Sequence, residues 1–314
     1  MSRWVLLFVL AAVSAPAGNL LAAGQAPARP AIASPSSPQS NEAPPTTEEI
    51  RARTKILIAN QHGNDRAIEE YERVELEMER GPGMNPHVLG SKKYRVVPTG
   101  FGPYRILLKQ DGSDVGNIEY RRELQRWEDA LQLALNPSDS RTSEIKAKFE
   151  KKQRDRAELV DAMQEAFIPH WIGREMREGR FCDIVVLDPN PEYRPHSLLQ
   201  EALSHVTVKI WVDHAANQLV RGEATITRDI SIGGGIFGKL YRGGVIAMDQ
   251  QEFAPGVWLP VRLQYDYTIR KFLFTSEEHK LVEISRYRRL GSPKEALAVV
   301  RSELAKPTPE RGDP

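Results

Sequence analysis

The clearest alternation of hydrophobic and polar positions lies in the carboxyl half of the chain. In residues 206–212 and 259–267, every second residue is aliphatic or aromatic. Successive side chains of a β-strand point to opposite faces, so each run predicts a strand with one buried face. Further apolar runs cover residues 181–187, 219–230, 245–248, 272–274 and 281–287. Their number and spacing predict one antiparallel sheet rather than alternating strands and helices.

The amino-terminal half begins with a helix signal followed by a hairpin signal. Thr46 followed by Glu49 fits a capping box, which predicts a short helix at the start of the domain. Residues 66–79 then alternate, with Leu76 and Met78 among the apolar positions and glutamates between them. A turn follows, and residues 93–97 are the predicted antiparallel partner.

Two segments between these strands have the period of a helix. Residues 118–135 place apolar side chains three and four apart, and residues 143–167 have an apolar face only toward their end. We expect an insertion at residues 118–168 whose helices cover the apolar face of the sheet. The residues predicted to form this helical lid are Leu124, Trp127, Leu131, Leu159, Met163 and Phe167. Gly173 and Gly179 are candidate hinges for its movement.

The ends of the chain differ in composition from the predicted domain, residues 46–291. An apolar run at residues 4–13 is too short for a membrane anchor and predicts a signal peptide over residues 1–24, although cleavage after residue 17 stays open. Residues 25–45 are rich in proline, serine and alanine and predict a disordered linker. Residues 292–314 predict a short helix and a flexible tail. We therefore expect an exported, periplasmic protein with no membrane span.

The net charge and the cysteine content argue against nucleic acid as a partner and against stabilisation by a disulfide. The 314 residues carry a formal net charge of +1, which gives no overall attraction to nucleic acid. The basic positions of residues 146–156 are interleaved with acidic ones, as on a solvated helix face. The single thiol, Cys182, cannot form an intramolecular disulfide and is expected to be a small buried residue rather than a nucleophile.

No motif in the sequence predicts catalysis, a metal site or a cofactor. Residues 233–238 have the spacing G-x-G-x-x-G, but a strand-like segment follows where a phosphate loop requires a helix, so a hairpin connection is favoured. His196, His205 and His214 lack the spacing of helical metal ligands, and His214 is expected in a surface loop. No G-x-S-x-G elbow is present. We expect the protein not to be an enzyme.

Several segments resemble a known family. They are Tyr94-Arg95-Val96-Val97-Pro98, Leu187-Asp188-Pro189-Asn190-Pro191-Glu192-Tyr193-Arg194-Pro195, Lys209-Ile210-Trp211-Val212-Asp213 and Gly256-Val257-Trp258-Leu259-Pro260. Over residues 48–290, the chain resembles the exported outer-membrane lipoprotein-sorting-like proteins of the LolA-like and LppX-like carrier superfamily. The resemblance implies an α+β fold, an incomplete antiparallel β-barrel covered by helices, with an apolar hollow that holds acyl chains.

Together these features predict a periplasmic carrier or binding protein for a hydrophobic ligand. The expected partner is a lipid or an acylated protein, held without a cofactor and driven by burial of apolar surface. The candidate lining residues are Val208, Ile210, Val212, Leu263, Tyr265, Phe272 and Phe274. The alternative is a module without a ligand that contacts another envelope protein or senses envelope stress.

Overall fold

The computed structural model describes residues 44–83, 86–232 and 238–307. The predicted signal peptide, almost all of the predicted linker, most of the glycine-rich loop and the end of the tail lie outside these residues. The strands are β1 (Tyr71–Arg80), β2 (Val88–Pro98), β3 (Pro103–Gln110), β4 (Ser113–Asp114), β5 (Phe167–Arg177), β6 (Arg180–Pro189), β7 (Val206–Asp213), β8 (Leu219–Ile226), β9 (Ile230–Ile232), β10 (Gly238–Leu240), β11 (Val245–Ala254), β12 (Val257–Lys271) and β13 (Phe274–Arg289).

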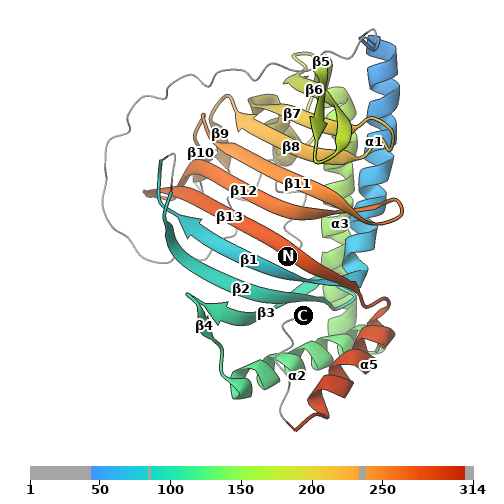
Figure 1. Ribbon diagram of the computed structural model, residues 1–314, viewed down its shortest axis with the longest axis vertical. Coiled ribbons are helices and arrows are strands. Elements are labelled where there is room, and N and C mark those ends of the chain that lie inside the picture. The colour runs from blue at the N-terminus through green and yellow to red at the C-terminus, as the bar shows by residue number, and fades with distance from the viewer. Residues whose placement is uncertain (1–43, 84–85, 233–237, 308–314) are drawn as a thin grey trace.

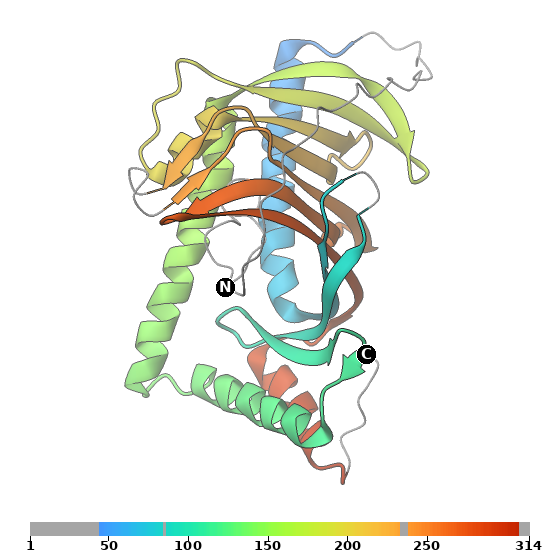
Figure 2. The ribbon, with the colours of Figure 1, turned by 90° about the vertical axis from the view of Figure 1, so that its left-hand side faces the viewer.

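All of these strands belong to one antiparallel sheet. Its order is β4-β3-β2-β1-β13-β12-β11-β8-β7-β6-β5, and β9 and β10 form a short branch in which β10 pairs with β12. The edge strands β4 and β5 do not pair with each other, so the curved sheet stays open (Figure 1 and Figure 2). The α+β class and the incomplete antiparallel barrel are therefore confirmed.

The helices are placed at two positions around this sheet. They are α1 (Thr47–Ala67), α2 (Asn117–Ala134), α3 (Ser140–Ala166), the single turn α4 (Leu198–Glu201) and α5 (Pro293–Leu304). The long helices α1 and α3 run across the direction of the strands, whereas α2 and α5 pack together near the β3 and β4 edge (Figure 1). The predicted capping box opens α1, because the backbone nitrogen of Glu49 donates to the Thr46 hydroxyl and that of Thr46 to the Glu49 carboxylate.

The larger hydrophobic core lies between the sheet and the two long helices. Aliphatic side chains of β7, β8, β11 and β12 form one buried cluster together with Ile50 of α1 and Leu159 of α3. A buried ion pair between Arg156 of α3 and Asp65 of α1 joins the two helices. These contacts fix both helices against the apolar sheet face.

A smaller core lies between α2, α5 and the opposite face of β2 and β3. Val97 and Ile106 contribute from the strands, Trp127 from α2 and Val300 from α5, and all of these are fully buried. The indole nitrogen of Trp127 donates to the Pro98 carbonyl at 2.8 Å, which satisfies its only polar group. The two helices of the predicted insertion therefore pack against different cores. Helix α3 covers the larger core, and α2 belongs to the smaller one.

Arg95 of β2 links this second core to the rest of the sheet. Its guanidinium donates to Glu72 at 2.8 Å, to Glu303 of α5 at 2.7 Å and to the Tyr120 hydroxyl at 2.9 Å. Arg95 and Glu72 are both buried, and breaking such a pair by removing one partner costs about 3–5 kcal/mol. The contact holds α2 and α5 in place on the strands.

The predicted strands and helices are found, with one shift. Strands β3, β4 and β5 and the single turn α4 were not predicted from the sequence, and α1 is longer than the short helix expected. The predicted strand at residues 272–274 is instead the end of the hairpin between β12 and β13. Phe272 has a positive φ of 54°, as the reversal of the chain requires.

Candidate functional site

The predicted lining residues lie in different environments. Val208, Ile210 and Val212 are packed inside the larger core. Leu263 and Tyr265 of β12 belong to the same cluster and also line a cavity. Phe272 and Phe274 lie at the hairpin end and are 63% and 67% exposed. The structure thus brings together only Leu263 and Tyr265 at a hollow, and ligand contact by the others stays a prediction.

The predicted lid residues are all at least partly buried, but not over one surface. Leu159 and Phe167 are buried in the larger core, and Met163 packs against it. Leu124, Trp127 and Leu131 lie in the smaller core on the other face of the sheet. Their role in covering a ligand stays a prediction.

The cavity has a volume of about 240 Å³ and lies on one face of strands β12, β13, β1, β2 and β3. Strand register places its wall residues next to one another, because Leu263 pairs with Val282, Val282 with Glu77, and Val96 with both Arg73 and Arg105. Side chains of directly paired residues share a face. The charged part of the wall consists of Arg73, Glu75, Glu77, Arg105 and Lys280. The remainder consists of Val96, Pro103, Tyr104, Leu263, Tyr265 and Val282.

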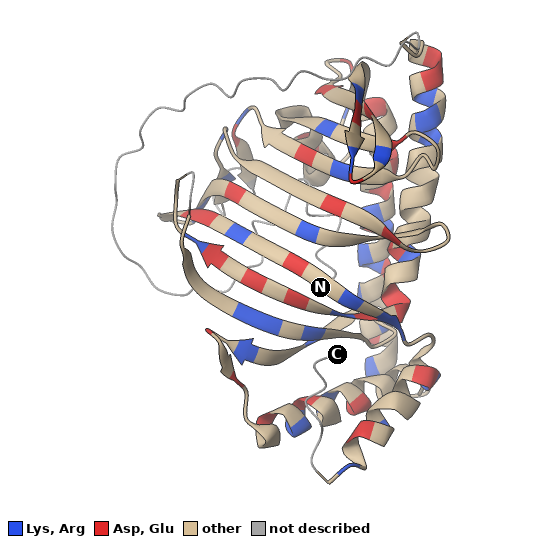
Figure 3. Cartoon of the chain, in the orientation of Figure 1, with Lys and Arg blue, Asp and Glu red and all other residues tan. Residues whose placement is uncertain are grey.

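A network of ion pairs forms the charged wall. One nitrogen of Arg105 lies 2.7 Å from a Glu75 oxygen and 2.6 Å from a Glu77 oxygen, and Arg73 donates to Glu75 at 2.9 Å. The Arg105 guanidinium also stacks over the Tyr94 ring at 4.0 Å. Burial acts to lower the pKa of Arg105, but the carboxylates of Glu75 and Glu77 outweigh it and raise the pKa. Acidic and basic residues on adjoining strands of this region are visible in Figure 3.

The sequence pattern of β1 did not reveal this wall. The strand was expected to be half-buried, with Leu76 and Met78 among its apolar positions. Both are half-buried, whereas Arg73, Glu75 and Glu77 on the opposite face are buried. The alternation was correct, but it does not say which face is turned inward. The available signal was the basic residue at position 105, but its own strand, β3, was not predicted.

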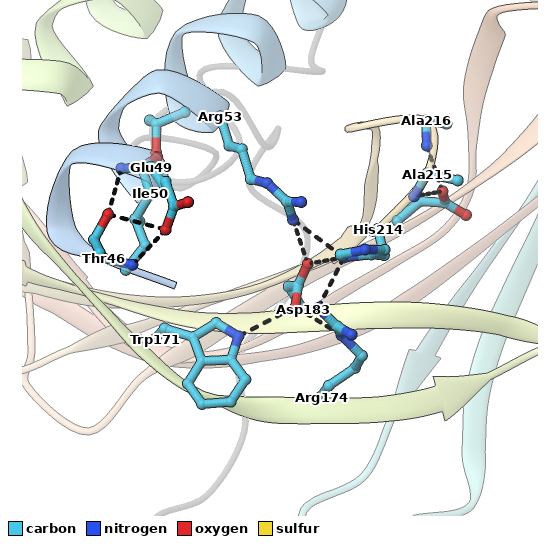
Figure 4. A network of polar contacts seen from close by, with 12 residues as sticks. Thr46, Glu49, Ile50, Arg53, Trp171, Arg174, Asp183, His214, Ala215 and Ala216 are labelled. Atoms are coloured by element: carbon cyan, nitrogen blue, oxygen red, sulfur yellow. Dashed lines mark hydrogen bonds and ion pairs between the residues drawn. The ribbon is translucent and has the colours of Figure 1, made fainter. Parts of the chain in front are cut away.

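A second polar network lies away from the cavity, around the buried carboxylate of Asp183 on β6 (Figure 4). Arg53 of α1 donates to it at 2.6 Å, Arg174 of β5 at 2.9 Å and the Trp171 indole at 3.2 Å. The Nδ1 atom of His214 lies 2.7 Å from the same carboxylate. The network fastens α1 to the edge of the sheet, and His214, expected in a surface loop, is one-third exposed and part of it.

The network around Asp183 has no neighbouring set of metal ligands. Among residues 44–83, 86–232 and 238–307, no group of at least three histidine, cysteine or acidic side chains could hold a metal ion. Burial raises the pKa of Cys182 to about 11, so its thiol is protonated at neutral pH, as expected for a buried structural cysteine. The G-x-G-x-x-G segment runs into strand β10 rather than a helix.

None of the helices in the described part of the chain is both long and apolar enough to cross a membrane. No protein-family model matches the sequence, and no curated protein matches it significantly.

Solved structures similar to this chain include three bacterial proteins. A DUF1329 family protein from Desulfovibrio piger aligns over 76% of this chain and 92% of its own, with 12% identity and a TM-score of 0.30. A putative outer membrane lipoprotein-sorting protein domain from Vibrio parahaemolyticus aligns over 79% and 99%, with 8% identity and a TM-score of 0.29. One chain of the MucA/MucB complex of Pseudomonas aeruginosa aligns over 76% of this chain and 96% of its own, with 8% identity and a TM-score of 0.18.

Proposed function

We propose that the chain is an exported, non-catalytic binding or carrier protein for a hydrophobic ligand, a lipid or the acyl chain of a protein. The observation that carries this proposal is the cavity of about 240 Å³ on the curved sheet. Its wall includes the apolar residues Val96, Leu263 and Val282, whose side chains are buried. An acyl chain placed against them would gain about 25 cal/mol for each Å² of apolar surface buried.

The size of the cavity limits what it can enclose. Pockets for drug-sized molecules usually have volumes of about 300–1,000 Å³. The cavity is below that range, and the neighbouring sheet face is filled by the packed core. The site therefore suits one short acyl chain or part of a longer one, rather than a whole lipid with two chains.

Purified, detergent-free protein should yield lipid on extraction with organic solvent, detected by mass spectrometry. It should also bind an environment-sensitive acyl probe saturably. Val282→Phe places extra carbons in the cavity and should weaken probe binding at least roughly tenfold, since the larger side chain takes volume that the probe needs. The control is Leu273→Ala on the 92% exposed hairpin end, which should bind the probe as the wild type does.

The absence of both extracted lipid and saturable probe binding would overturn the proposal. That result would favour the alternative function, an envelope protein-interaction module without a ligand.

A further inference from the structure

We propose that the ligand of this cavity is an anionic amphiphile, whose carboxylate or phosphate head group is bound by Lys280. The inference rests on the proposed function, because it requires that the cavity takes an acyl chain. It goes further by assigning the charge of the ligand and the residue that recognises it.

The charged side chains on the cavity wall do not fully balance one another. Arg73 and Arg105 are both engaged with the carboxylates of Glu75 and Glu77. These two basic and two acidic groups neutralise one another at neutral pH. Lys280 is then the surplus positive charge among the lining residues.

Lys280 is half-buried and has no partner for its charge among the described residues. Its backbone lies between Tyr265 of β12 and Glu79 of β1, and its side chain is half-buried. Glu79 is exposed, and no hydrogen bond or ion pair joins the Lys280 ammonium to this or any other described residue. A positively charged group that lines a cavity and has no protein partner can bind an anionic ligand.

Lys280 lies next to the apolar part of the cavity wall. Val282 is two residues along the same strand and therefore on the same face, about 7 Å away. Leu263 lies directly across from Val282. A head group at Lys280 thus leaves the attached chain beside Val282 and Leu263, which is the geometry that an amphiphile requires.

The ligand class can be tested with matched probes that differ only in the head group. Isothermal titration calorimetry would compare dodecanoate and dodecyl phosphate, each below its critical micelle concentration, with methyl dodecanoate below its solubility limit. Hydrogen bonds to charged groups are strong enough to make at least one anionic probe bind roughly tenfold tighter than the neutral ester. Whether the carboxylate or the phosphate gains more would identify the source of the head group.

Lys280→Met keeps the length of the side chain and removes its charge. This variant should abolish the preference for the anionic probes while leaving affinity for the ester within about twofold of the wild type. Lys271→Met is the matched control, because Lys271 is on the same hairpin, is paired with Glu278 at 3.5 Å and does not line the cavity. It should retain the preference.

Equal binding of the ester and both anionic probes by the wild type would overturn the inference and leave the proposed function intact. A preference that survives Lys280→Met would also overturn it. Failure of all three probes to bind would instead contradict the proposed function itself.

Discussion

At the scale of single residues, the carboxylate of Asp183 makes stability dependent on pH. Burial acts to raise its pKa, but hydrogen bonds involving His214, Trp171 and Arg174 outweigh burial and lower the pKa below the ordinary value for aspartate of about 3.9. The folded state therefore binds the proton less readily than the unfolded state. The stabilisation from Asp183 is complete above that ordinary value and is lost as the pH falls through the lower pKa of the folded protein.

Asp183→Asn should accordingly lower the free energy of unfolding at pH 7 by on the order of 3 kcal/mol, since it removes one member of a buried ion pair. The difference from the wild type should shrink as the pH falls below about 4, because the wild-type carboxylate of the folded protein is then progressively protonated. Urea unfolding at several pH values measures it. Asp155→Asn, on the exposed face of α3, is the control and should change stability by less than about 0.5 kcal/mol. A difference for Asp183→Asn that stayed constant down to pH 3 would contradict this account.

At the scale of secondary-structure elements, replacing glycine by alanine should have opposite effects on stability at two positions. Gly63 lies inside α1, and a methyl group added there would meet no atom within 4 Å. Gly63→Ala should stabilise the protein by about 0.5–1 kcal/mol, because glycine loses more backbone entropy in a helix. Gly244 precedes β11, and its added methyl would lie 2.7 Å from the Tyr267 Cβ and 3.2 Å from its Cα. Gly244→Ala should therefore destabilise by roughly 1–3 kcal/mol.

Thermal and urea unfolding of both alanine variants would measure these changes. Each variant serves as the control for the other, because the side chain gained is identical and only its surroundings differ. A loss of stability in Gly63→Ala would contradict the entropic argument for α1. No loss in Gly244→Ala would show that the close approach of Gly244 to Tyr267 does not limit this part of the sheet.

Elements with local sequence signals were predicted well, whereas those that depend on distant contacts were not. A final short helix was predicted within residues 292–314, and Pro293 with the Ser292 and Glu295 capping box defines the start of α5. Strand β5 was missed because it is an edge strand, contains Pro169 and has an irregularity between Trp171 and Gly173. Such features interrupt the alternation from which strands are predicted.

The candidate site was predicted less completely than the fold, for the same reason. Leu263 and Tyr265 were identified from alternation along their own strand, and both line the cavity. The ion pairs of Arg105 with Glu75 and Glu77 connect β3 to β1, and no local pattern specifies that pairing. A strand with charges on one face and leucine and methionine on the other gives no local indication that the charged face is the buried one.

At the scale of the whole molecule, the cavity lies between the two hydrophobic cores. Leu263 and Val282 of its wall belong to the larger core, while Val97 and Ile106, on the opposite face of β2 and β3, belong to the smaller one. Arg95 further joins β1 and β2 to α5. A ligand in the cavity contacts strands that both cores require, so its binding energy should stabilise both cores together.

A ligand that binds only the folded state at 100 times its dissociation constant adds about 2.7 kcal/mol to the free energy of unfolding. For a protein of this size, that corresponds to a rise in Tm of roughly 5–10 °C. Differential scanning calorimetry with dodecanoate should show a single unfolding transition that shifts upward as a whole. Lys280→Met at the same ligand concentration should show a smaller shift. A ligand effect confined to one of two resolved transitions would mean that the cores unfold independently and that the cavity belongs to only one of them.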